Sequence, residues 1–226
     1  MIYFKLRQFK KGDEIVTKYV DMSMREFADE LASKKSMPGG GSVAAYALTL
    51  SNGLASMVAN FTTGKKKYAE FEEDIQKILE ETEKMSESIL SMVDEDAEAF
   101  LPLAAVYKML AETENQKREK EIEMQKCLKN AAMVPMKLLR TCSKVLDLHT
   151  ELLTKGSKML ISDVGVGVQM LKSAALSAQL NVLININGVN DCEFVDKMSS
   201  ELETLINEIS EKCDKIYSEV LKDVRK

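Results

Sequence analysis

The feature that most constrains this chain is a long segment without charge. From Met37 to Gly64 no residue carries a charged side chain, although charged residues make up 30% of the sequence. A segment of this length can cross a membrane as a helix, or it can form a helix enclosed by a soluble protein. Asn52 and Asn60 interrupt the apolar run, and every polar group in lipid needs an internal partner. We therefore expect a helix over 42–63 that is buried on all sides in protein, with no membrane partner.

The composition favours an all-α protein and narrows its partners. Good helix formers (Leu, Met, Ala, Glu, Lys) are abundant, whereas there are only three prolines and ten glycines. The net charge of −5 argues against nucleic acid, which requires a basic face. One histidine and four widely spaced cysteines without a CxxC pair predict no metal site. They favour the reduced thiols of a cytoplasmic protein.

Caps and breaks divide the chain into about six long helices in one antiparallel bundle. Ser23 and Glu26 form a capping box at the first helix, and Asn190 resembles the cap of the last one. Residues 1–21 form an extension with a possible short β-hairpin that turns at Gly12, and residues 22–226 form a single helical domain. The helices are expected at 23–35, 42–63, 68–107, 114–153, 162–187 and from 190 to the end of the chain.

Two of these helices carry uncharged polar residues at every fourth position, which places them on one face of each helix. The residues are Asn52, Ser56 and Asn60 on one helix, and Ser173, Ser177, Asn181 and Asn185 on the other. Such stripes either make hydrogen bonds between helices or line a polar cleft for a ligand. Both alternatives stay open for each stripe, although two stripes in one small protein strengthen the case for a cleft.

Asp96 differs from the other acids of the run Asp94-Glu95-Asp96. Its neighbours at helical spacing are all apolar, which places it on the inward face, whereas Asp94 is expected to be exposed. Burial raises the pKa of a carboxyl group and so prepares it for general acid/base work near neutral pH. A structural aspartate that accepts hydrogen bonds is the alternative. Asp96 is the first catalytic candidate.

Two further motifs suit anions. The turn after Pro38 leads into a helix N-terminus, where free N–H groups and the helix dipole attract negative charge. It lacks the Lys-Ser/Thr ending of a P-loop, so ATP is not expected. Its candidate residues are Gly39, Gly40, Gly41 and Ser42. A lysine run follows the uncharged helix and is either a solvated helix end or an anchor for a polyanionic tail. It consists of Lys65, Lys66 and Lys67.

Taken together, these segments resemble the cyclodeaminase domain of formiminotransferase-cyclodeaminase and its stand-alone bacterial relatives. The resemblance covers about residues 22–225. Residues 1–21 lie outside it, and Pro102 departs from the family pattern. The matching stretches are Pro38–Ala45, Ser56–Thr62, Met92–Phe100, Ala132–Pro135, Ser162–Asp163 and Asn181–Asn185.

The resemblance implies a homodimer that binds a polyglutamylated folate in a cleft and needs no further cofactor. It also implies closure of 5-formiminotetrahydrofolate to 5,10-methenyltetrahydrofolate with loss of ammonia, and Asp96 as the general acid/base. Asp163, Asn181 and Asn185 would hold the pterin or orient the acid, and Lys65 to Lys67 would meet the glutamate tail. Two alternatives are a methenyltetrahydrofolate cyclohydrolase, which forms 10-formyltetrahydrofolate, and a non-catalytic folate-binding helical protein.

Overall fold

A computed structural model of the chain describes residues 9–11, 14–16 and 18–225. Within these residues six α-helices account for most of the chain, so the prediction of an all-α bundle is confirmed. The helices are α1 (Met24–Ala32), α2 (Gly40–Asn60), α3 (Glu72–Tyr107), α4 (Glu114–Lys155), α5 (Ile161–Ile186) and α6 (Cys192–Val224). Three short 3-10 helices join them: η1 (Tyr19–Asp21), η2 (Lys66–Phe71) and η3 (Lys158–Leu160).

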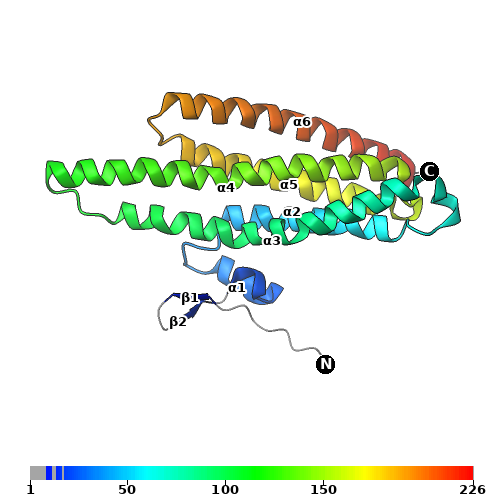
Figure 1. Ribbon diagram of the computed structural model, residues 1–226, viewed down its shortest axis with the longest axis horizontal. Helices are drawn as coiled ribbons and strands as arrows, with labels where there is room; N and C mark the ends of the chain where they lie inside the picture. Colours follow the sequence, from blue (N-terminus) through cyan, green and yellow to red (C-terminus); the bar gives the residue numbers. More distant parts are fainter. Residues whose placement is uncertain (1–8, 12–13, 17, 226) are drawn as a thin grey trace.

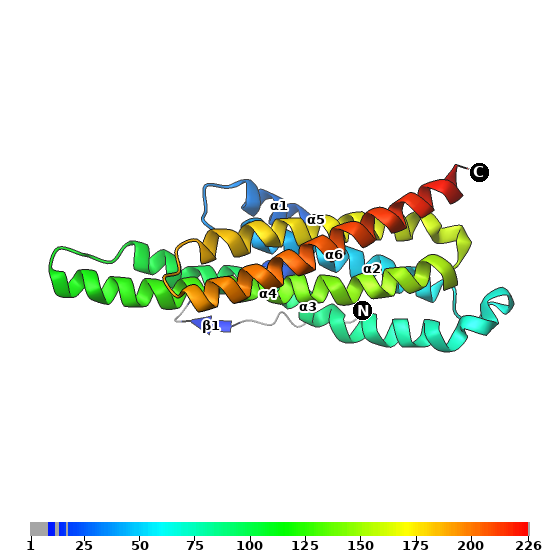
Figure 2. The ribbon, with the colours of Figure 1, turned by 90° about the horizontal axis from the view of Figure 1, so that it is seen from above.

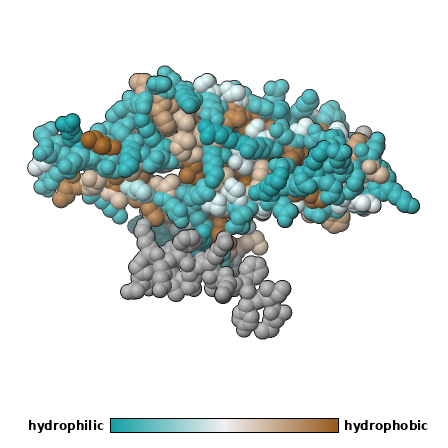
Figure 3. Space-filling view, in the orientation of Figure 1, coloured by the Kyte–Doolittle hydropathy of each residue, from teal (hydrophilic) through white to brown (hydrophobic). Residues whose placement is uncertain are grey.

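Four long helices, α2 to α5, run alongside one another, and α6 lies across α4 and α5 (Figures 1 and 2). Their core is continuous through the bundle. It includes Leu48, Ile89, Leu139, Leu171 and Ile209, one from each of α2 to α6, and all are fully buried. Figure 3 shows that the face seen in Figure 1 is mainly hydrophilic. The bundle thus follows from amphipathic helices that bury their apolar sides together.

The N-terminal elements lie together on one side of the bundle, next to α2 and α3 (Figure 1). Strands β1 (Phe9–Lys11) and β2 (Glu14–Val16) pair antiparallel. The turn predicted at Gly12 lies outside the described residues.

The cap predictions are confirmed at one helix and wrong by one residue at another. Ser23 and Glu26 form the expected capping box of α1, with reciprocal contacts of 3.2 and 2.8 Å. The cap of α6 is Asp191 rather than Asn190, because the Asp191 carboxylate accepts from the N–H of Phe194. The Asn190 amide instead donates to Glu121 on α4.

The prediction that the uncharged helix is buried on all sides is wrong. On α2, Val43, Leu50 and Phe61, which follows its last turn, are 37%, 44% and 55% exposed, because α2 packs mainly against α3, α4 and α5 and these residues lie on another side of it. By length and composition alone α2 could cross a membrane, and so could the segment Lys158–Ile186. Both nevertheless pack against neighbouring helices of the bundle, as core helices of soluble proteins do.

The one histidine lies in the centre of the bundle. His149 of α4 is fully buried, and its Nε2 lies 3.0 Å from the Ser51 hydroxyl oxygen and 3.2 Å from the Ser51 carbonyl oxygen. Burial lowers the pKa of His149 to about 4. Gly167 permits this packing, since a Cβ there would come within 2.2 Å of the imidazole. The histidine is thus a neutral core residue.

We expect this burial to make the free energy of unfolding fall by about 3 kcal/mol as the pH drops from 6.5 towards 4. The unfolded chain takes up a proton at the ordinary histidine pKa, whereas the folded chain resists it down to about pH 4. Urea unfolding at a series of pH values measures the loss, and His149→Gln should show a smaller one. NMR of the single imidazole gives an independent check. If it titrates near pH 6.5 in the folded protein, the prediction is wrong.

Candidate functional site

The three consecutive acids of α3 point in three directions. Asp94 is buried, and one carboxylate oxygen accepts from the N–H of Tyr19 at 2.8 Å, which ties η1 to α3. Burial raises the pKa of Asp94, and the hydrogen bond from Tyr19 opposes this. The prediction that Asp94 is exposed is wrong, because η1 packs over its side of the helix. Asp94 therefore anchors the N-terminal segment.

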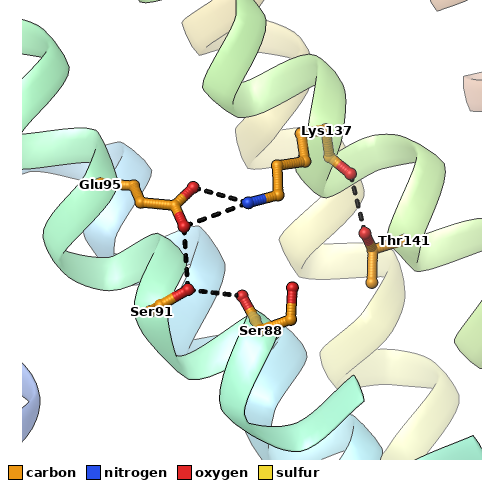
Figure 4. A network of polar contacts seen from close by, with 5 residues as sticks. All are labelled: Ser88, Ser91, Glu95, Lys137 and Thr141. Carbon is orange, nitrogen blue, oxygen red and sulfur yellow. Dashed lines mark hydrogen bonds and ion pairs between the residues drawn. The ribbon is translucent and has the colours of Figure 1, made fainter. Parts of the chain in front are cut away.

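Glu95 joins two helices (Figure 4). Its carboxylate accepts from Lys137 of α4 at 2.8 Å and from Ser91, one turn earlier, at 2.9 Å. The hydroxyl of Thr141, one turn after Lys137 on α4, donates to the backbone carbonyl of Lys137. Both members of the ion pair are partly exposed, so it adds little stability. Glu95 thus faces α4, whereas Asp96 lies on a different side of α3.

Asp96 reaches the N-terminus of α2. One of its carboxylate oxygens lies 3.3 Å from the Ser42 hydroxyl oxygen, which itself donates to the carbonyl of Val93 at 2.8 Å. Burial raises the pKa of Asp96, while the hydroxyl and the backbone N–H of Ser42 both favour the charged form and oppose the rise. The carboxylate is therefore held in place and yet holds its proton more tightly than a solvated aspartate does.

Gly41 makes this approach possible. A Cβ at Gly41 would lie 1.9 Å from an Asp96 carboxylate oxygen, so no larger residue fits while Asp96 keeps its place. The N-cap of α2 is Gly39, which has no side chain to satisfy the free N–H groups of the first turn. Asp96 supplies from α3 the negative charge that a helix N-terminus attracts.

A cavity of about 260 Å³ opens beside Asp96. Phe100 and Tyr107 of α3 form an aromatic wall, and Asn181 and Asn185 of α5 form a polar one. Each amide nitrogen donates to the carbonyl one turn earlier, at 2.8 and 2.7 Å. No described residue donates to either amide oxygen, so both oxygens can accept from a ligand. The cavity thus combines one carboxylate, two amides and aromatic surface.

The structure brings together most of the predicted residues. The residues that line the cavity are Gly39, Gly40, Gly41, Asp96, Asn181 and Asn185. Ser42 does not line it, but its hydroxyl donates a hydrogen bond to Asp96. Sequence reasoning missed Phe100 and Tyr107. Their signal was present, since Asp96, Phe100, Leu103 and Tyr107 follow one another at helical spacing and share a face.

Two predicted elements lie elsewhere in the chain. Asp163 is on the first turn of α5, about 27 Å along the helix from Asn181 at the usual rise per residue. Lys65, Lys66 and Lys67 follow the C-terminus of α2, whose two ends are about 30 Å apart. Within one chain, neither Asp163 nor the lysine run belongs to the cavity around Asp96.

The two polar stripes also separate. Asn52, Ser56 and Asn60 line a different groove between α2 and α3. The Asn52 amide donates to the carbonyl of Thr82 at 2.9 Å, so this member of the stripe makes a hydrogen bond between helices. On α5, Asn181 and Asn185 line the cavity, whereas Ser173 and Ser177 do not. The stripe on α2 therefore lines a groove of its own and also makes a hydrogen bond between helices, and only Asn181 and Asn185 belong to the cavity around Asp96.

A helical bundle with a desolvated carboxylate, two free amide oxygens and aromatic walls in one cavity has the features of an acid/base enzyme for a small ring-containing substrate. The family model described as formiminotransferase-cyclodeaminase matches residues 23–204. The chain belongs to the formiminotransferase-cyclodeaminase family.

Individual relatives agree with this membership. The methenyltetrahydrofolate cyclohydrolase of Methylorubrum extorquens is 36% identical over 198 residues, which cover 88% of this chain and 95% of that protein. The formimidoyltransferase-cyclodeaminase of Rattus norvegicus is 31% identical over 84% of this chain, but the match spans only 35% of the rat protein. The crystal structure of formiminotetrahydrofolate cyclodeaminase from Thermotoga maritima superposes with a TM-score of 0.77 at 31% identity. The superposition covers 91% of this chain and 96% of that one.

Proposed function

We propose that this chain is an enzyme of folate one-carbon metabolism, a 5-formiminotetrahydrofolate cyclodeaminase in which Asp96 is the general acid/base. The observation that carries the proposal is the Asp96 carboxylate, which is desolvated, fixed by Ser42 and open to a cavity with two free amide oxygens. The family membership supports a folate as the substrate.

The reaction needs one proton to be moved twice. The N10 nitrogen of the folate attacks the carbon of the protonated formimino group on N5, and a tetrahedral carbon forms that bridges N5 and N10 and bears an amino group. Asp96 takes the proton from N10 and delivers it to the amino group on this carbon. The bond from carbon to that nitrogen then breaks, ammonia leaves, and 5,10-methenyltetrahydrofolate remains. A carboxyl group with a raised pKa suits both steps, because it accepts a proton more readily than a solvated aspartate does and can then give it to the leaving amine.

The other cavity residues bind the substrate. The amide oxygens of Asn181 and Asn185 accept from the N–H groups of the pterin, and Phe100 and Tyr107 pack against its rings. Gly39, Gly40 and Gly41 leave room at the helix N-terminus. The proposal includes a cytoplasmic homodimer and a polyglutamylated folate. It is supported by the uncharged, exposed sides of α2 and α5 and by the exposed lysines at 65–67. Asp163 lies too far from Asp96 to act within its own chain.

Methenyltetrahydrofolate cyclohydrolase is a second candidate, favoured by the Methylorubrum relative that matches almost end to end. In that reaction water adds to the same carbon while Asp96 removes one of its protons. N5 then takes up a proton as its bond to this carbon breaks, and the hydroxyl on the carbon loses its proton to become the formyl carbonyl. Both reactions pass through a tetrahedral carbon at the same position, so the same carboxylate serves either.

An assay with enzymatically generated 5-formiminotetrahydrofolate tests the proposal. Methenyltetrahydrofolate absorbance and ammonia should appear together and in equal amounts. If neither appears but added methenyltetrahydrofolate disappears faster than it does without enzyme, the protein is the cyclohydrolase. Absence of both activities would favour the non-catalytic folate-binding protein.

Replacing Ser42 with alanine is expected to shift the pH profile of turnover upwards. The Ser42 hydroxyl lowers the pKa of Asp96, so its removal raises that pKa further. Asp96 must be ionised to accept a proton, and activity therefore declines at a higher pH as the solution is acidified. Profiles of kcat against pH for both proteins measure the shift. An acid limb that stays in place or moves downwards would contradict the assigned role of Ser42.

A further inference from the structure

A second cavity adjoins α3 on a different side from the cavity around Asp96. It has a volume of about 310 Å³ and lies between the N-terminal segment and α3 (Figure 1). Asp94 and Leu101 of α3 line it, whereas Asp96 lines the other cavity. Residues two apart on a helix point to nearly opposite sides, so Asp94 and Asp96 belong to different surfaces. We call this second cavity the Asp94 pocket; its walls come from within residues 18–37 and 94–101.

Asp94 places a buried acceptor on the wall of this pocket. Its side chain is only 8% exposed, and Oδ1 accepts from the backbone N–H of Tyr19 at 2.8 Å. The second oxygen, Oδ2, has no hydrogen-bond partner among the described residues. Buried polar atoms are nearly always paired, and an unpaired charged one costs free energy. An asparagine would accept from Tyr19 equally well, so the tie to the N-terminal segment does not account for a carboxylate here.

The charges around the pocket favour a cation. Among the described residues, three carboxylates and two lysines line it. Lys35 bonds both oxygens of Glu30, at 2.9 and 2.6 Å, so these two charges offset each other. Burial raises the pKa of Asp94, and the nearby Lys18 opposes this rise only in part. Glu98 adds a second negative charge at the exposed edge, one turn after Asp94. A positively charged donor therefore suits the pocket better than an anion does.

The remaining walls are aromatic and apolar. The ring of Tyr19 is held edge-on against Phe27, with 6.5 Å between ring centres, and its face can contact a cation. Met22, Met37 and Leu101 complete the lining, and methionines adapt to irregular ligands. No group of three metal-ligating side chains occurs in the described part of the chain, which disfavours a bare metal ion. The volume instead lies at the lower end of the roughly 300–1,000 Å³ of organic ligand sites.

We propose that the Asp94 pocket is a second ligand site, which binds the ammonium group of a small organic amine at Asp94 and the apolar body of the amine against Tyr19, Met37 and Leu101. The ammonium group supplies the donor for Oδ2. Met37 also lines the cavity around Asp96, so the two sites are neighbours. They open on different sides of α3, and both can be occupied at once.

Three probes of one size test the charge preference. Benzylamine is protonated at neutral pH, benzyl alcohol is neutral and benzoate is an anion. Benzylamine should bind about tenfold more tightly than benzyl alcohol, as expected for one charge-assisted hydrogen bond, and benzoate should bind least. NMR of methyl-labelled methionines measures the affinities and the location. The methyl signals of Met22 and Met37 should shift, and that of Met57, near the other end of α2, should not.

Two results of this titration would overturn the proposal. If benzyl alcohol or benzoate binds as tightly as benzylamine, the pocket does not recognise an amine. If none of the probes binds, an ordered water satisfies Oδ2 of Asp94 instead of a ligand.

Charge removal assigns the preference to Asp94. Asp94→Asn keeps an acceptor for the N–H of Tyr19 but removes the charge, so benzylamine and benzyl alcohol should bind this variant with similar affinity. Glu95→Gln is the matched control, because the neighbouring Glu95 bonds Lys137 on another side of α3. Circular dichroism checks that both variants fold. An equal loss of preference in both variants would mean that benzylamine responds to the general negative charge of α3, and the site would be refuted.

Filling the pocket provides a second test that leaves Asp94 intact. Leu101 is 57% exposed, so Leu101→Trp should fold and should remove benzylamine binding by occupying the space of its ring. Leu110→Trp, at a position that is 67% exposed and outside the pocket, should bind benzylamine as the wild type does. Unchanged affinity in Leu101→Trp would place the amine elsewhere and overturn the proposal.

A competition experiment separates the pocket from the cavity around Asp96. Benzylamine should remain bound when folic acid is added, and Asp96→Asn should bind benzylamine with the wild-type affinity. Displacement of benzylamine by folic acid, or its loss in Asp96→Asn, would show that the pocket is a part of the catalytic site and not a second site.

Discussion

Replacing Asp96 with asparagine is expected to lower kcat by about 10²- to 10⁴-fold, the usual contribution of a positioned general acid/base. Asparagine is close in size and can keep a hydrogen bond to Ser42, but it cannot carry the proton from N10 to the leaving amine. Folate affinity should stay within a few-fold, because the amides and the aromatic wall are unchanged. Single-turnover kinetics and equilibrium binding of a folate measure the two effects separately.

The stability of this variant provides the control. Burial raises the pKa of Asp96, so the folded state disfavours the charged carboxylate at neutral and higher pH. Removing that charge should leave the thermal midpoint at pH 8 unchanged or higher. Turnover at the wild-type rate would show that Asp96 is not the acid/base. A lower midpoint together with lost activity would indicate a structural aspartate instead.

Replacing Gly41 with alanine is expected to reduce turnover by about 10²-fold, since a displacement of about 1 Å in a catalytic group can have that effect. The new Cβ would come within 1.9 Å of an Asp96 oxygen, so the carboxylate must rotate away from Ser42 and from the substrate. Both kcat and the pH profile should change, because Asp96 loses the hydrogen bonds that oppose the rise of its pKa.

Gly39→Ala is the matched control for this prediction. A Cβ at Gly39 would meet its nearest atom, the Met37 sulfur, at 3.8 Å, which is an ordinary contact. The two substitutions add the same methyl group to the same turn, yet only the one at Gly41 is directed at the carboxylate. Equal losses of activity in both variants would mean that the turn needs glycine for its flexibility, and that the approach of Asp96 is not the reason.

Signals within single segments of the sequence were sufficient to predict the helices and to identify Asp96 as the principal site residue. The capping box at Ser23, the breaks at Pro38 and Gly156 and the apolar periodicity act within a few residues, so the sequence alone places the helices and gives their ends to within about four residues. Asp96 could be identified in the same way, because its apolar neighbours at helical spacing belong to its own helix. Asn181 and Asn185 came from a stripe on a single helix, and the resemblance to a known family gave them a role.

The sequence was wrong, or left two alternatives open, where the answer depends on which elements meet. Asp94 resembles a surface residue on its own helix, yet η1 packs over it. The stripe of Asn52, Ser56 and Asn60 resembles that of α5, but it faces α3 rather than the cavity. The uncharged helix was expected to be enclosed, and one side of it is open.

The sequence by itself determined the helical class, the approximate positions of the helices and a carboxylate on an inward face, since these depend on periodicity and capping within single helices. Only the tertiary structure decided that the Asp96 carboxylate packs against Gly41 at the start of α2. It also decided that Asp163 and the lysine run lie about 30 Å from the cavity around Asp96. These facts depend on how helices distant in sequence are packed. Packing is set by side-chain fit between helices, which no single segment of the sequence contains.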